Sequence, residues 1–247
     1  MKVLVTGASG LLGSRMMRAI PDDWSVTGTY HSSEHPDLIE CDLLDCREGK
    51  RLLQEGNYDW LVHCAANRNP DVCENAPKAA MDLNAEATEW LARAAADTAC
   101  RMLYVSTDYV FPGTDPPYRE EDRTRPINVY GHSKLAGEEH TLHVPGGLVV
   151  RVPALYSLDL GAPNNLLGAL QASLKAGSEV RGDDDLVRYY TLAEDVAAAC
   201  LFLIESARYG VVHVSAEQST TKYEFLCAAA EVLGEPASLV KEAPTGA

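Results

Sequence analysis

Short apolar segments alternate with helix-like segments from the start of the sequence to about residue 216. Almost wholly apolar runs are typical of strands buried on both faces, and their alternation with helices is typical of parallel sheets. The sequence therefore predicts an α/β fold with a doubly wound, Rossmann-type parallel sheet. The expected strands are 3–6, 24–30, 38–41, 60–65, 102–106, 147–152 and 211–215; the expected helices are 11–20, 47–55, 77–96, 164–176, 192–206, one starting near 129 and one starting at a capping box at 221–224.

We expect this sheet to form a dinucleotide-binding domain over residues 1–152, with a smaller C-terminal substrate-binding region, interleaved with the sheet, over 153–247. The chain has 247 residues, of which 46% are hydrophobic and 23% charged, a typical globular composition. It contains no apolar run of 18 residues and no signal-peptide pattern, so we expect a cytoplasmic protein. The seven cysteines are scattered and include no C-x-x-C pair, so we expect neither a disulfide framework nor a metal site.

The net charge of −15 limits the partners that the protein can bind. An acidic surface repels nucleic acid backbones and anionic membranes, so we expect neither as a partner. An anionic cofactor or substrate must then be held by local hydrogen-bond donors. The sequence is compatible with a homodimer and does not specify one.

A glycine-rich turn, Thr6-Gly7-Ala8-Ser9-Gly10-Leu11-Leu12-Gly13, follows the first expected strand and opens the first helix. Glycines at such a position allow a tight turn and close approach of the backbone to a pyrophosphate, and the helix N-terminus supplies free N–H donors. The spacing is G-x-x-G-x-x-G, which alone is a weak signal, but its place between strand and helix favours dinucleotide binding. The expected cofactor-binding residues of the turn are Gly7, Ser9, Gly10, Leu11, Leu12 and Gly13.

The end of the second strand favours NADP(H) over NAD(H). A carboxylate there would bind the ribose 2′-hydroxyl and repel a 2′-phosphate, but the stretch 28–33 contains none. His31, Ser32 and Arg15 could contact a 2′-phosphate, although His31 could equally be an exposed loop residue. Asp42, with Leu43 beside it, is a candidate partner for the adenine, although a surface aspartate would look the same.

A Tyr-x-x-x-Lys element lies in the segment that is expected to be helical near residue 129. Tyr130 and Lys134 are four residues apart and therefore share one helix face. A nearby ammonium favours the phenolate, so we expect a lowered pKa for Tyr130 and a role as general acid. The pair gains weight from the polar cluster 106–109, which ends a parallel strand at the edge where ligands of such sheets bind.

These segments together resemble the extended short-chain dehydrogenases/reductases, and among them the sequence is most similar to the dTDP-4-dehydrorhamnose reductases. The segments that carry the resemblance are TGASGLLG (6–13), HCAA (63–66), STDYVF (106–111), RPINVYGHSKLAGEE (125–139) and RYYTLAEDVA (188–197). The resemblance implies an NAD(P)H-dependent reductase that acts on a keto group of a nucleotide-activated sugar, or of another small keto substrate.

The resemblance also implies roles for single residues. Tyr130 would donate the proton, Lys134 would hold the nicotinamide ribose, Thr107 would bind the substrate carbonyl, Asp108 would contact the sugar, and Asn84 would support the site. The further residues implied are Ala65 and Ala66 along the cofactor, and Arg151 and Arg188 for sugar or phosphate contacts. For Asn84 and the two arginines, a helix-face or surface position without a role in the site is an equally good interpretation.

Two alternatives remain open. An epimerase or dehydratase on the same scaffold would bind NAD, but dehydratases of this superfamily carry Thr-Asp-Glu after the strand, and Tyr109 stands in the third position here. The regulatory beta subunit of methionine adenosyltransferase also resembles this family, which implies a non-catalytic, NADP-binding module. The family's proline before the threonine of the 188–197 segment is replaced by Tyr190, which affects the expected substrate subsite.

Overall fold

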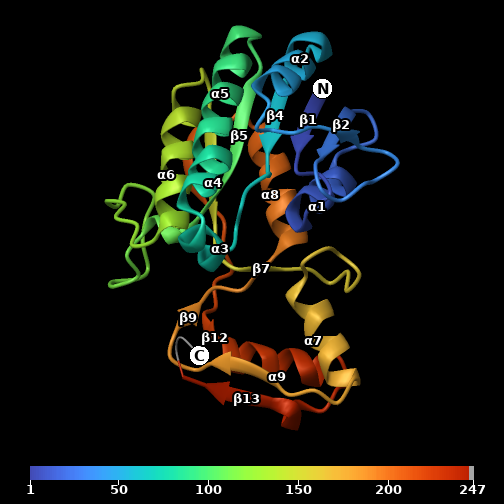
Figure 1. Cartoon of the computed structure of the whole chain (residues 1–247), viewed down its shortest axis with the longest axis vertical. Helices are drawn as coiled ribbons and strands as arrows, with labels where there is room; N and C mark the ends of the chain where they lie inside the picture. The colour runs from blue at the N-terminus through green and yellow to red at the C-terminus, as the bar shows by residue number, and fades with distance from the viewer. Residues whose placement is uncertain (245–247) are drawn as a thin grey trace.

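The computed structural model describes residues 1–244. Within this part, seven parallel strands form one sheet in the order β11-β6-β5-β4-β1-β2-β3 (Figure 1). These strands are β1 (Lys2–Thr6), β2 (Ser25–Tyr30), β3 (Ile39–Glu40), β4 (Trp60–His63), β5 (Arg101–Thr107), β6 (Leu148–Val152) and β11 (Gly210–His213). The chain runs outward from β1 in one direction and from β4 in the other, so the order reverses between these two strands. The predicted doubly wound Rossmann-type sheet is confirmed.

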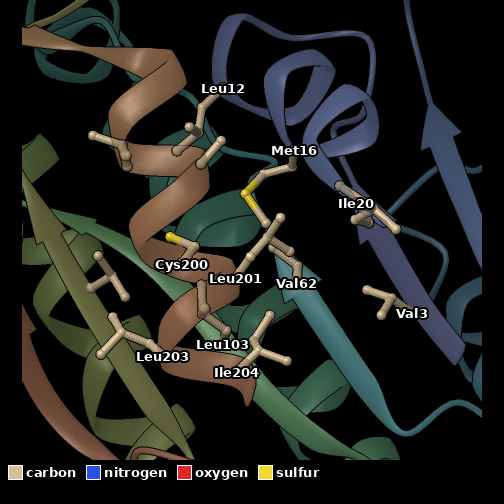
Figure 2. Packing of buried hydrophobic residues seen from close by; sticks show 14 of the residues in the cluster. Val3, Leu12, Met16, Ile20, Val62, Leu103, Cys200, Leu201, Leu203 and Ile204 are labelled. Atoms are coloured by element: carbon tan, nitrogen blue, oxygen red, sulfur yellow. The ribbon is translucent and has the colours of Figure 1, made fainter. Parts of the chain in front are cut away.

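Helices cover both faces of the sheet because every central strand is buried and apolar. The helices α1 (Leu11–Ala19) and α8 (Ala193–Glu205) pack together on one face; α2 (Cys46–Gly56), α5 (Ala87–Asp97) and α6 (Val129–Leu142) lie on the other. Figure 2 shows Leu12 and Met16 of α1 beside Cys200 and Leu201 of α8, close to Val62 of β4. These contacts fix the N-terminus of α1, and with it the glycine-rich turn, against the edge of the sheet.

A smaller C-terminal region lies beyond the carboxyl ends of the strands (Figure 1). Its elements are α7 (Leu166–Lys175), α9 (Lys222–Val232), and the strand pairs β8 (Val180–Asp183) with β13 (Val240–Ala243), β9 (Val187–Arg188) with β12 (Thr220–Thr221), and β7 (Leu155–Tyr156) with β10 (Thr191–Leu192). Leu170, Leu174, Leu226 and Val240 form its own small core. Because α8 and β11 return to the sheet, the chain after residue 152 both builds this region and completes the main layer.

The expected long helix over 77–96 is interrupted in a way that matters for the site. It consists of α4 (Pro77–Met81), a π-helical turn at Asp82–Glu86, and α5, and it is preceded by the unpredicted helix α3 (Pro70–Asn75). The other predicted helices and sheet strands occur within about two residues of their expected ends. The short strand pairs of the C-terminal region were not predicted, because two to four residues carry no readable periodicity. No helix within residues 1–244 is long and apolar enough to span a membrane.

Candidate active site

A cavity of about 740 Å³ opens where the order of the strands reverses, at the carboxyl ends of the sheet strands. Its wall combines the glycine-rich turn, the ends of β2 to β6, α6 and residues of the C-terminal region. The residues predicted from the sequence that line it are Gly7, Ser9, Gly10, Leu11, Leu12, Gly13, His31, Ser32, Asp42, Leu43, Ala65, Ala66, Thr107, Asp108, Tyr130, Lys134 and Arg188. The structure therefore brings most of the predicted site residues into one space.

The three glycines of the turn differ in what a side chain at each position would meet. Gly7 has a φ of +65°, and a Cβ there would lie 2.8 Å from the backbone of Ala65; a Cβ on Gly13 would lie 2.1 Å from the carbonyl oxygen of Gly7. Gly10 has an ordinary φ of −83°, and a Cβ there would meet only the carbonyl oxygen of Gly7, at 3.2 Å. Internal packing thus requires Gly7 and Gly13, whereas Gly10 leaves space open on the cavity side.

The same turn presents the uncapped N-terminus of α1 to the cavity. Gly10 is the N-cap residue, and no side chain of the described residues accepts a hydrogen bond from this end of the helix. The first turn of α1 contains no acidic residue. Free N–H groups and the positive end of the helix dipole favour an anionic group such as a pyrophosphate. The turn therefore fits the dinucleotide that its sequence predicts.

Thr107, Tyr130 and Lys134 meet on the opposite side of the cavity. Thr107 ends β5, and its hydroxyl donates to a carboxylate oxygen of Asp108 at 3.1 Å and interacts with the phenol of Tyr130. Tyr130 and Lys134 lie on one face of α6, whose N-cap residue, Asn128, accepts a hydrogen bond from the backbone of residue 131. The hydroxyl of Thr107 and the phenol of Tyr130 can therefore converge on one oxygen atom of a bound molecule.

The pKa of Tyr130 differs from the sequence prediction. Burial raises the pKa above its ordinary value of 10.0, the interaction with the hydroxyl of Thr107 lowers it, and the charge of Asp108 raises it further. The expectation of a lowered pKa is therefore wrong for the protein without its cofactor, because desolvation of the phenolate is the largest effect, the neighbouring charges add to it, and Lys134 is not among the groups that shift this pKa. The phenol consequently stays protonated across the neutral range, as a proton donor requires.

Burial has the opposite effect on Lys134. The side chain is 2% exposed, its Nζ lies 3.9 Å from the ring centroid of Tyr104, and desolvation lowers its pKa from 10.5 to about 7. The carboxylate of Glu138 acts against this by favouring the charged ammonium. Lys134 therefore titrates close to neutral pH, and small changes in its surroundings change its charge.

Asn84 lies outside the cavity wall, at the π-helical turn, and acts as a clamp. Its side-chain oxygen accepts from the backbone N–H of Asn67 at 2.7 Å, and its side-chain nitrogen donates to the carbonyl of Asn67 at 2.8 Å and to the hydroxyl of Ser133 at 3.0 Å. Its own carbonyl accepts from Tyr104 and Thr88. Asn84 thus holds the loop after β4 against α6, the helix that carries Tyr130 and Lys134.

Two arginines that the sequence suggested as ligand contacts, Arg151 and Arg15, do not line the cavity. Arg151 is 7% exposed and forms an ion pair with Glu138, at 2.7 Å, beneath the cavity instead of in its wall. Arg15 is likewise absent from the described wall, because it pairs with Asp159 at 3.0 Å and with Glu194 at 3.5 Å. Partners distant in sequence have engaged both guanidinium groups, so neither is free for a sugar or a 2′-phosphate.

The cavity has further lining residues that were not among the predicted site residues. Arg68 follows β4, and Asp183, Tyr190 and Lys222 come from the C-terminal region. The ring of Tyr190, which replaces the proline of the family pattern, stacks on Phe225 at a centroid distance of 4.1 Å. The capping box that begins α9 placed Lys222 at a helix start but gave no signal that this helix borders the cavity.

Tyr109, next to Asp108, is part of the same wall and is fixed on both sides. Its hydroxyl accepts a hydrogen bond from Arg188 at 3.1 Å, and its ring packs edge-on against Tyr130 at a centroid distance of 5.5 Å. A phenol at this position cannot replace the carboxylate that the dehydratases of the superfamily carry. Tyr109 instead positions Arg188 and the ring of Tyr130.

Comparisons with known proteins agree with this geometry. A family model described as the RmlD substrate binding domain matches residues 1–247. The chain is 38% identical to methionine adenosyltransferase 2 subunit beta of Danio rerio, over 100% of this chain and 79% of that protein. It is 35% identical to a probable low-salt glycan biosynthesis reductase of Haloferax volcanii, over 98% of this chain and 83% of that protein.

Solved structures show the same relationship. A hypothetical dTDP-4-dehydrorhamnose reductase from Sulfolobus tokodaii has a TM-score of 0.89 at 30% identity, with 98% of this chain and 86% of that chain covered. A dTDP-4-dehydrorhamnose reductase from Bacillus anthracis in complex with NADP has a TM-score of 0.89 at 26% identity, with 99% and 84% covered. The resemblance inferred from the motifs is confirmed: the chain belongs to the RmlD substrate binding domain family.

Proposed function

We propose that the protein is an NAD(P)H-dependent reductase of a keto group on a nucleotide-activated sugar. The observation that carries this proposal is that the glycine-rich turn and the Thr107–Tyr130–Lys134 group open on one cavity. The cavity extends from the sheet edge to residues of the C-terminal region, so a ligand bound next to the catalytic group would also contact that region. The reductases among the relatives and solved structures support the same assignment.

The chain's own residues have distinct tasks in this reaction. The turn at Gly7–Gly13 would hold the pyrophosphate of the cofactor, and Lys134 its nicotinamide ribose. When bound, the reduced nicotinamide supplies a hydride to the keto carbon. Thr107 and Tyr130 bind the keto oxygen and orient it, and Tyr130 gives its phenolic proton to that oxygen as negative charge develops there.

The C-terminal region would bind the nucleotide part of the substrate. Arg188 and Lys222 are cations in the cavity wall, and Asp108 lies beside Thr107 where a sugar hydroxyl could donate to it. In a chain with a net charge of −15, these local cations supply the attraction that an anionic diphosphate needs. The ring of Tyr190 adds an apolar surface for a base or a sugar.

The direct test is to incubate the purified protein with NADPH and a panel of 4-keto sugar nucleotides and to follow the consumption of NADPH. Turnover of any member that depends on Tyr130 supports the proposal. A second candidate, a non-catalytic binding subunit, is favoured by the 38% identity to methionine adenosyltransferase 2 subunit beta. Binding of NADPH without turnover across the panel would favour that candidate and reject the reductase.

A prediction follows for the choice of cofactor. The residues that line the cavity at the end of β2 and directly after it, Tyr30, His31, Ser32 and Ser33, include no carboxylate, so we expect NADPH to bind about tenfold more tightly than NADH. Isothermal titration of the two cofactors measures this ratio. Ser32→Asp is the matched variant, because a carboxylate there should repel a 2′-phosphate and reverse the preference. Tighter binding of NADH by the parent would contradict the prediction.

A second prediction concerns Gly10. Gly10→Asp is expected to abolish cofactor binding, because the side chain would occupy the open space and its charge would repel the pyrophosphate. Aspartate is also a favourable N-cap, so the free energy of unfolding should stay equal or rise by about 0.3 kcal/mol. Urea unfolding and cofactor titration measure the two effects. Gly10→Ser introduces an uncharged N-cap residue that is similar in size to aspartate, and it should lose less affinity for the cofactor. If Gly10→Asp binds the cofactor as tightly as the parent, the glycine-rich turn has only a structural role.

A further inference from the structure

A buried ion pair lies directly behind the catalytic helix. The side chains of Glu138 and Arg151 are 2% and 7% exposed. One carboxylate oxygen of Glu138 accepts from Nη2 of Arg151 at 2.7 Å; the other accepts from Nε of Arg151 at 2.9 Å and from the hydroxyl of Ser106 at 2.5 Å. For stability alone, a well-packed apolar pair of similar volume does as well as a buried ion pair. Stability alone therefore does not explain why a carboxylate, that of Glu138, lies at this position.

The carboxylate joins the two elements that carry the catalytic side chains. Glu138 lies on α6 four residues after Lys134, on the same helix face. Its partner Ser106 is the residue immediately before Thr107 on β5, and Arg151 lies on the neighbouring strand β6. A shift of α6 along β5 would break these bonds. Glu138 thus fixes the helix that bears Lys134 relative to the strand that bears Thr107.

The charges around Lys134 single out Glu138. The ammonium nitrogen of Lys134 lies over the ring of Tyr104 on β5, and Lys134 interacts electrostatically with His63 at the end of β4, with Cys64 directly after it, and with Glu138 on its own helix. Burial lowers the pKa of His63 to about 3 and raises the pKa of Cys64 to about 12, so both are neutral at physiological pH. Among these described neighbours, the carboxylate of Glu138 is therefore the group that carries a negative charge.

We propose that Glu138 is a positioning residue of the active site: it locks α6 to β5 and holds a negative charge one helical turn from the side chain of Lys134. This inference rests on the proposed function for its role in catalysis. In its ammonium form, Lys134 has three N–H groups that can donate to the ribose hydroxyls of the cofactor, and no acceptor. Arg151 holds the carboxylate in place, which accounts for its position away from the cavity. The pair acts through Lys134 and does not touch the reacting atoms.

The test measures the protonation of Lys134 directly in the cofactor-free protein. Lysine labelled with ¹³C at the ε-carbon reports its own titration by NMR, and Lys134→Arg identifies the resonance. In Glu138→Gln the midpoint of Lys134 is expected to fall by about one unit or more, because an attractive charge is lost. Glu139→Gln is the matched control: it makes the same change one residue further along α6, at an exposed position, and should leave the midpoint unchanged.

Glu138→Gln leaves the guanidinium of Arg151 buried without its partner, which can prevent folding. The double variant Glu138→Gln/Arg151→Met removes both charges and keeps the volume, and its Lys134 midpoint should also lie below that of the parent. A midpoint equal to that of the parent in either folded variant would overturn the proposal and leave the pair a structural one.

Turnover gives an independent measurement. In the parent, the alkaline limb of the pH–turnover profile should follow the loss of the Lys134 proton, and the limb should move to lower pH in Glu138→Gln but not in Glu139→Gln. An unmoved limb in Glu138→Gln would overturn the role in catalysis. If the NMR midpoint moves while the parent reduces no keto substrate, the proposed function fails, but the link between Glu138 and Lys134 stands.

Discussion

Tyr130→Phe is expected to lower the turnover of a 4-keto sugar nucleotide by roughly 10²–10⁴, the contribution of a positioned general acid. The change removes one oxygen and keeps the ring, which packs edge-on against Tyr109 and is 8% exposed. The fold and the affinity for NADPH should therefore change little, since the phenol is not a main anchor of the cofactor. Steady-state kinetics together with isothermal titration separate these effects.

The matched control is Tyr118→Phe. Tyr118 also packs its ring against an aromatic partner, Phe111, but it lies in the loop before α6 and does not line the cavity described here. Loss of its hydroxyl should leave turnover within about twofold of the parent, because the change lies outside the cavity and removes no contact with the catalytic group. If Tyr130→Phe turns over the substrate as fast as the parent, the proton comes from another group and the mechanism is wrong.

Lys134→Met is expected to have a larger effect on function than Tyr130→Phe. It removes the charged contact to the cofactor, which should weaken cofactor affinity about 10–100-fold, and it removes the positive charge beside the reacting group. Both the affinity and the turnover should therefore fall. Titration with NADPH and single-turnover measurements at saturating cofactor distinguish the two losses, and an unchanged affinity would contradict the assigned contact.

The same variant should be more stable than the parent at neutral and acidic pH. The pKa of Lys134 is about 7 in the folded protein and 10.5 ordinarily, so between these values the unfolded chain binds more protons. The contribution of Lys134 to the free energy of unfolding therefore rises with pH across that window and is least favourable below pH 7. Lys134→Met removes this penalty and should gain at least about 1 kcal/mol at pH 6, with the gain shrinking toward pH 10.

Urea unfolding of the cofactor-free proteins at several pH values measures this difference. Lys222→Met is a suitable control, because Lys222 also lines the cavity but is only partly buried, at the start of α9. A Lys134→Met protein that is less stable than the parent at pH 6 would show that the ammonium over Tyr104 stabilises the fold, contrary to the cost assigned to its burial.

The sequence predicted the sheet and the position of the site for the same reason. Strands such as β1 and β5 are buried on both faces and therefore apolar along their length, and their carboxyl ends must meet at one edge. Any polar residues at those ends, among them Thr107, are brought together whatever the loops do. The helical spacing of Tyr130 and Lys134 was enough to place both on the cavity side of α6.

Properties that depend on the total surroundings of a group could not be predicted in this way. The direction of the pKa of Tyr130 follows from burial by several elements, not from the lysine one turn away. Arg15 finds its partner Asp159 144 residues later in the chain. Asn84 lies in a π-helical turn and makes hydrogen bonds with Asn67 and Ser133, and no helical periodicity reveals either feature.

The late position of β11 in the chain has a consequence for biosynthesis. The hydrophobic layer beneath α1 is covered by α8, and the sheet edge at β6 is paired by β11, which ends at His213, 61 residues after Val152. At about 5–20 residues per second, a ribosome needs about 3–12 seconds to make this stretch. Throughout that interval the nascent chain exposes an apolar surface and an open strand edge, the features that chaperones bind.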